Sequence, residues 1–129
     1  MVRPKARELT ERELEVMRAF WDHGEGTAED ARKRLQQDGT KLAYVTVANV
    51  VRQLEEKGFL KQETQQRPFI YAAKKSFDDV SSRLVGNLLQ KLFDGSRERM
   101  LVQMLGRKKL TPSEREFLRE LLEKQEKKR

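Results

Sequence analysis

The sequence predicts a mainly α-helical protein with one small β-hairpin, and three observations lead to this fold class. Apolar residues recur with helical spacing through residues 10–57. Two short apolar runs, separated by a polar turn, follow at residues 59–72. From residue 77 onward the pattern is helical again and carries no strand signal. We therefore expect two domains, residues 1–76 and residues 77–129.

The first helix is expected to begin after Thr10, because Thr10 and Glu13 have the spacing of a capping box. Gly24 and Gly26 are expected to end this helix. Its apolar stripe consists of Leu14, Val16, Met17, Phe20 and Trp21. Thr27 should cap a short second helix. The apolar face of that helix consists of Ala28, Ala31 and Leu35.

A third helix is predicted over residues 43–57, and Gly58 stands where a helix commonly ends in a left-handed residue. Its inward face consists of Val47, Val50, Val51 and Leu54. The strands of the hairpin are expected at residues 59–63 and 68–72. The turn between them is Thr64-Gln65-Gln66-Arg67.

The remaining chain predicts three helices. Ser76 and Asp79 form a capping signal for the first, Gly95-Ser96 separates it from the second, and Thr111 begins the third, which dissolves into a charged tail at residues 123–129. An apolar content of only 36% favours a core shared between two copies. We expect this homodimer contact to involve Leu84, Leu88, Leu92, Met100, Met104, Leu118, Leu121 and Leu122.

Composition excludes several classes of site. The chain has no Cys and a single His, His23, so neither a disulfide framework nor a thiolate metal site can form, and no cofactor is expected. No paired acid and base, nucleophile elbow or phosphate loop is present, so we expect no enzyme. No apolar run approaches the length of a membrane span, and we expect a soluble cytoplasmic protein without membrane insertion.

Three short helices followed by a hairpin is the order of a winged helix-turn-helix, in which the third helix enters the major groove of DNA. The net charge of +7 permits a polyanionic partner. We expect contacts to double-stranded DNA from Lys41, Tyr44, Thr46, Ala48, Asn49, Arg52 and Gln53, and from Gln65, Gln66 and Arg67 of the hairpin. Arg3, Lys5 and Arg7 would add phosphate contacts.

Each of these residues also has a simpler interpretation. A polar helix face is usually only solvated, and a winged helix can serve as a protein-interaction module instead of a DNA-binding one. We expect Trp21 to be a core residue and not a base-stacking platform, since it lies on the apolar stripe. His23 is expected to be a helix-end residue and not a catalytic group.

The chain resembles the penicillinase and methicillin-resistance repressors (BlaI/MecI/CopY-like) from about Leu9 to Lys124. The segments that carry the resemblance are Leu9-Thr10-Glu11, Glu15-Val16-Met17, Trp21, Thr46-Val47, Leu54-Glu55-Glu56-Lys57-Gly58-Phe59-Leu60, Arg67, Tyr71, Leu92-Phe93-Asp94-Gly95-Ser96, Leu110-Thr111-Pro112-Ser113-Glu114, Leu118 and Leu121-Leu122. No single segment is diagnostic, but their order and spacing together are specific.

The resemblance implies a dimeric transcriptional repressor that binds pseudo-palindromic operators through its winged helix. In one branch of this family a membrane sensor-peptidase system triggers cleavage of the helical arm, and in another a Cys-rich motif senses copper. This chain departs from the family pattern in three places. It has no Cys, it has Gln103-Met104 at the family's Asn-Phe cleavage step, and it has Ala43-Tyr44 where relatives often have a Ser cap and a Pro.

Overall fold

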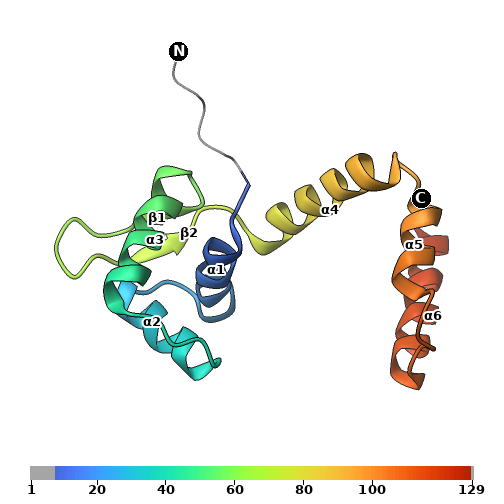
Figure 1. Ribbon diagram of the computed structural model, residues 1–129, viewed down its shortest axis with the longest axis horizontal. Coiled ribbons are helices and arrows are strands. Elements are labelled where there is room, and N and C mark those ends of the chain that lie inside the picture. The colour runs from blue at the N-terminus through green and yellow to red at the C-terminus, as the bar shows by residue number, and fades with distance from the viewer. Residues whose placement is uncertain (1–7, 129) are drawn as a thin grey trace, which may run out of the picture. The chain divides into compact units, whose positions relative to one another are not determined.

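The computed structural model describes residues 8–128, and its elements follow the order predicted from the sequence (Figure 1). These elements are α1 Glu11–His23, α2 Ala28–Gln37, α3 Tyr44–Glu56, β1 Leu60–Gln62, β2 Tyr71–Ala73, α4 Phe77–Phe93, α5 Arg97–Leu105 and α6 Pro112–Lys127. The predicted fold class is confirmed: a winged helix-turn-helix region is followed by helices alone. Two compact units are present, Met1–Ser81 and Ser82–Arg129. None of the helices within residues 8–128 is both long enough and apolar enough to cross a membrane.

The first unit is built around a single apolar core to which α1, α2, α3 and the hairpin all contribute. The predicted inward faces of α2 and α3 are buried, which confirms both patterns. The buried apolar side chains are Val16, Met17, Ala19, Phe20, Ala28, Ala31, Leu35, Val47, Val50, Val51, Leu54, Phe59, Leu60 and Val80. Val80 belongs to α4, so the first turn of this helix forms part of the first unit.

The beginning of α1 is fixed by the predicted capping box and by an ion pair that the sequence analysis did not anticipate. Thr10 Oγ1 accepts a hydrogen bond from Glu13 N–H at 3.1 Å, and Glu13 Oε1 accepts one from Thr10 N–H at 2.8 Å. Glu13 Oε1 also lies 2.8 Å from Lys57 Nζ, at the end of α3. Burial by itself would raise the pKa of Glu13, but the hydrogen bonds and the charge of Lys57 outweigh it and lower that pKa.

The end of α3 is closed by Gly58, as predicted. Gly58 has φ +85°, a conformation that side-chain-bearing residues rarely adopt. Gly58 N–H donates to Glu55 O and Phe59 N–H donates to Leu54 O, which is the pair of bonds in a Schellman motif. The start of the same helix is weaker, because Ala43 supplies no side-chain cap. Ala43 stands where relatives often have a Ser cap, so the side-chain capping bond is absent here.

The hairpin differs from the prediction in its bounds. Leu60 pairs with Ala73, and Gln62 pairs with Tyr71, so the loop spans residues 63–70 and is longer than the predicted four-residue turn. Pro68 lacks an N–H group and cannot donate to the ladder, which moves the second strand toward the C-terminus. Thr64 closes the loop instead, because its hydroxyl accepts from Ile70 N–H at 3.0 Å.

Gly26 has a different role from the predicted one. Gly24 alone caps α1, with φ +87° and its N–H bonded to Phe20 O. Gly26 instead forms a β-bridge with Tyr71, donating to Tyr71 O at 3.0 Å and accepting from Tyr71 N–H at 2.8 Å. A Cβ at Gly26 would lie only 3.0 Å from the Arg34 guanidinium, which itself holds the carbonyls of Gly24 and Glu25.

The second unit is helical and open. The predicted capping box of Thr111 and Glu114 is present at the start of α6. The last helix was expected to dissolve into the charged tail at residue 123, and this is wrong, because α6 continues to Lys127. Glu, Lys and Gln are good helix formers, and the basic residues of the last turn are favourable at the negative end of the helix dipole. None of residues 82–128 is buried.

We expect the Glu13–Lys57 pair to govern the stability of the first unit. Glu13 is 2% exposed and is the one buried charged residue among those described. Replacing Lys57 with Met would leave this carboxylate buried without its cation, which costs about 3 kcal/mol. Urea unfolding should show this loss. Lys61→Met is the control: its pair with Glu63 is exposed, so its removal should cost at most about 0.5 kcal/mol.

The pair should also shape the response to acid. Because the folded pKa of Glu13 lies below its ordinary value of 4.5, Glu13 contributes stability that is complete above that pH and is lost as the pH falls through the folded pKa. A Glu13→Gln variant should lack this part of the acid dependence. A Lys57→Met variant as stable as wild type at neutral pH would contradict the assignment.

Candidate nucleic-acid interface

The outward face of α3 is formed by exposed and half-buried side chains. Asn49, Arg52 and Gln53 are exposed, Tyr44 is 52% exposed, and Thr46 and Ala48 are half-buried. The four buried residues of α3 define the opposite face. Successive residues of a helix are turned by about 100°, so a side chain at i+4 or i+7 returns to nearly the same direction.

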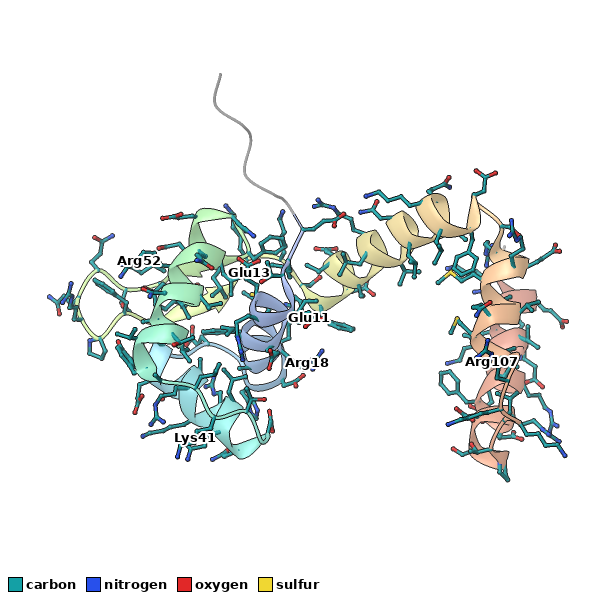
Figure 2. The ribbon with its side chains drawn as sticks, viewed as in Figure 1. Glu11, Glu13, Arg18, Lys41, Arg52 and Arg107 are labelled. Atoms are coloured by element: carbon teal, nitrogen blue, oxygen red, sulfur yellow. The ribbon has the colours of Figure 1, made fainter. Side chains whose placement is uncertain are left out.

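An open groove separates this face from the hairpin. Figure 2 shows Arg52 on the flank of α3 that faces the hairpin loop. The groove is lined at the start of α2 by Thr27, Ala28 and Glu29. Its α3 residues are Tyr44, Val45, Ala48, Asn49, Val51, Arg52 and Glu55, and its hairpin residues are Gln62, Arg67, Pro68, Phe69 and Tyr71. The structure thus brings together Tyr44, Ala48, Asn49, Arg52 and Arg67 from the predicted set.

Thr46 and Gln53 are not among the residues that line this groove. They are seven residues apart and therefore share one side of α3, on the other flank of its exposed face. The major groove is wide enough to admit a whole α-helix, so both flanks of α3 can lie near base edges. The predicted residues of α3 accordingly occupy two flanks of one exposed surface, with Asn49 near its centre.

Several residues of the groove were not among the expected contacts, and Val45, Glu55 and Tyr71 are three of them. Val45 was not among the expected contacts, yet it is 67% exposed. It precedes Asn49 by four residues, and this spacing could have identified it. Glu55 follows Arg52 by three residues, so helical spacing could have identified it too. Tyr71 lies on β2, and only the folding of the hairpin beside α3 brings it to the groove.

Charges of both signs surround the Tyr71 hydroxyl. Burial raises the pKa of Tyr71, and the carboxylate of Glu55 raises it further, while the cations of Arg52 and Arg67 act in the opposite direction. Arg67 also stacks on Phe69, with its guanidinium carbon 5.5 Å from the ring centroid. The groove is therefore lined by the arginines Arg52 and Arg67, by the carboxylates of Glu29 and Glu55, and by apolar ring surface.

The loop of the hairpin presents polar side chains to solvent. Gln65, Gln66 and Arg67 are all exposed, as expected. Thr64 fixes the shape of the loop, because its hydroxyl donates to Gln66 O and its carbonyl accepts from the Gln62 amide at 2.7 Å. This loop can therefore hold cationic and amide groups at a defined place beside α3.

A second, shallower depression lies at the start of α3. Its lining includes Lys41, Ala43 and Tyr44 together with Arg32 and Glu29. Arg32 is engaged by Glu29 through two hydrogen bonds, at 2.6 and 2.8 Å. The hydrogen bond from Arg32 accordingly lowers the pKa of Glu29. Lys41 is exposed, and Figure 2 shows it on the chain that leads into α3.

The remaining candidate residues are placed as follows. Arg3, Lys5 and Arg7 lie outside the described residues. Trp21 is half-buried: its Nε1–H donates to Lys75 O at 3.0 Å, and its ring meets Phe77 edge-on at 5.3 Å. His23 is the exposed last residue of α1, as predicted. Within residues 8–128, no group of three or more His, Cys, Asp or Glu side chains could hold a metal ion.

The residues expected at the dimer contact form a largely exposed apolar surface within the second unit. Leu84, Met100 and Leu118 are half-buried there. The exposed members are Leu88, Leu92, Met104, Leu121 and Leu122. Exposed apolar neighbours that were not in the expected set are Val85, Leu101, Val102, Leu105 and Phe117.

The family model for the penicillinase repressor matches residues 9–124. The penicillinase repressor of Bacillus licheniformis is 24% identical over 119 residues, which is 92% of each chain. A solved structure of Bordetella bronchiseptica BpsR, described for the regulation of its DNA binding by 6-hydroxynicotinic acid, is 21% identical with a TM-score of 0.45, and the match covers 96% of this chain and 83% of that one. The chain thus belongs to the penicillinase repressor family, and it is a DNA-binding transcriptional repressor and not an enzyme.

Proposed function

We propose that the protein represses transcription as a homodimer that binds a pseudo-palindromic operator, with α3 of each copy in the major groove. The observation that carries this proposal is the exposed stripe of α3 that includes Asn49 and Arg52, directly opposite its buried face. Asn can form paired hydrogen bonds with adenine, and Arg can do so with guanine. Two such helices related by a two-fold axis match two half-sites.

The hairpin has a different task in this proposal. Arg67 lies across the groove from α3, where it contacts the phosphate backbone beside the bases that α3 reads. Gln66 and Lys41 add polar contacts to the same backbone, and Tyr44, Thr46, Ala48 and Gln53 complete the surface of α3 that faces the DNA. Phosphate contacts fix the register, whereas contacts to base edges supply the sequence preference.

The roles of these residues predict a specific mutational pattern. An Arg52→Ala/Asn49→Ala variant should lose most of its preference for the operator over random DNA, because each base-reading pair contributes about 1–3 kcal/mol of discrimination. Fluorescence anisotropy with a labelled operator and a scrambled duplex measures this ratio. Circular dichroism should remain that of the wild type, since both side chains are exposed.

Two further variants separate the roles of the surface. Arg18→Ala removes an exposed arginine of α1 that does not line the groove, and it should retain the operator preference. Arg67→Ala should weaken binding to operator and to scrambled DNA alike. It should also lower the slope of log affinity against log salt concentration by about one. Wild-type operator preference in the Arg52/Asn49 double variant would overturn the reading role of α3.

The dimer is supported by the second unit. Thirteen large hydrophobic residues are exposed in the described chain, and ten of them follow residue 81. Soluble proteins seldom leave so much apolar surface in contact with water. A second copy of the same chain offers a matching apolar surface, and its symmetry agrees with that of a pseudo-palindromic site. Leu88, Leu92, Leu118 and Leu121 are the residues we place in the contact.

Charge placed on this surface should break the dimer. Leu92→Lys puts a cation where the contact would exclude water, so the variant should sediment as a monomer and bind operator weakly. Gln90→Lys adds the same charge two residues away, on the other side of α4, and should remain dimeric. Sedimentation equilibrium at micromolar concentration distinguishes the two. A monomeric wild type with full operator affinity would contradict the dimer.

Release from DNA is proposed to follow cleavage within α5, near Gln103 and Met104, by a system that a membrane sensor-peptidase controls. Both residues are exposed. Cleavage there would separate α6 from the rest of the arm and end the gain in affinity that two linked reading domains provide.

A chain truncated after Gln103 should therefore bind operator about 10²-fold more weakly than the full chain. In cells, loss of repression should coincide with a fragment ending near Gln103, detected by immunoblotting of an N-terminal tag. Full-length protein that persists through complete derepression would exclude cleavage as the switch.

A further inference from the structure

Val45 is exposed in a way that packing does not explain. It is the second residue of α3 and is 67% exposed, whereas Val47, Val50 and Val51 of the same helix are at most 7% exposed. In the described part of the first unit, no other exposed large hydrophobic side chain has as high an exposed fraction. An apolar side chain in this position gains little from the core of its own unit.

Helix stability does not account for Val45 either. Val45, Thr46 and Val47 are three consecutive β-branched residues in the first turn of α3. Such side chains lose rotamer freedom in a helix, so Ala would favour the helix more strongly. The turn also lacks a side-chain cap from Ala43, which would have offset this cost. The residue is therefore unfavourable locally as well as exposed.

The position of Val45 is that of a reading residue. Val45, Asn49 and Arg52 follow one another at i, i+4 and i+7, a spacing that places them on one face of a helix. All three line the same groove beside the hairpin. A DNA duplex that contacts Asn49 and Arg52 would consequently also meet Val45.

The chemistry of the major groove leaves one partner for this side chain. Base edges there present hydrogen-bond donors and acceptors, and the C5-methyl group of thymine is the apolar exception. An isopropyl group can neither donate nor accept a hydrogen bond. We propose that Val45 packs against a thymine methyl group in each half-site and so selects thymine at one position. This inference rests on the proposed entry of α3 into the major groove.

Deoxyuridine provides the test, because it differs from thymidine only by that methyl group. The probe is a duplex selected from a random pool by the wild-type dimer, resynthesised with each thymine replaced singly by deoxyuridine. Wild-type protein should bind two of these duplexes, one for each half-site, about fourfold more weakly, which is the effect of removing one buried methyl contact. Val45→Ala removes the contact in both half-sites, so it should bind the thymine duplex about 16-fold more weakly than wild type and should no longer distinguish uracil at these positions.

Asn49→Ala is the matched control on the same face. It should weaken binding yet keep the wild-type sensitivity to uracil, because the methyl contact does not involve its amide. Val45→Ala should fold, since Ala is the better helix former. If no uracil substitution in the selected duplex weakens binding of the wild type, the role of Val45 alone is overturned. The same holds if Val45→Ala and the wild type lose the same affinity on uracil substitution. A pool that never enriches a sequence overturns the reading function of α3, and the inference with it.

Discussion

Val47, Val50, Val51 and Leu54 are each at most 7% exposed, and through them α3 packs against α1, α2 and β1. Their spacing fixes the rotation of α3 about its own axis, because a rotation by one residue would bring a polar side chain into the core. The direction of every exposed side chain on α3 follows from this. Asn49 and Arg52 project into solvent because their neighbours Val50 and Val51 are buried in the core. The groove forms beside the hairpin because β1 also packs against α3.

The ion pair of Glu13 with Lys57 fixes the end of α3 against α1. Its two residues are 44 positions apart, and Glu13 also caps α1, so one carboxylate connects the first turn of α1 to the last residue before Gly58. The Schellman motif at Gly58 then directs the chain into β1. The start of the hairpin is therefore fixed relative to α3, and the loop that carries Arg67 is held in shape by the hydrogen bonds of Thr64.

Local signals in the sequence predicted most of this architecture, and non-local ones were missed. Capping boxes, the Gly58 ending and the apolar face of α3 depend on residues within one or two turns, so spacing alone identifies them. The bridge of Gly26 with Tyr71 and the pairing of Glu13 with Lys57 depend on which distant segments meet, and no periodicity encodes that. Val45 was missed for another reason. It was given no role, although its outward direction follows directly from the inward face that was predicted.

The second unit has an apolar surface that a single chain leaves exposed. Its helices carry apolar side chains at helical spacing, yet none of residues 82–128 is buried, so the pattern that creates a core in the first unit creates an exposed surface here. In the proposed dimer this surface has two consequences. Joining two reading helices raises the affinity for two half-sites through effective concentration, without any further contact to DNA. The affinity then depends on α4, α5 and α6, which are remote in sequence from α3, so a change in these helices can release the operator while the reading face and its specificity remain intact.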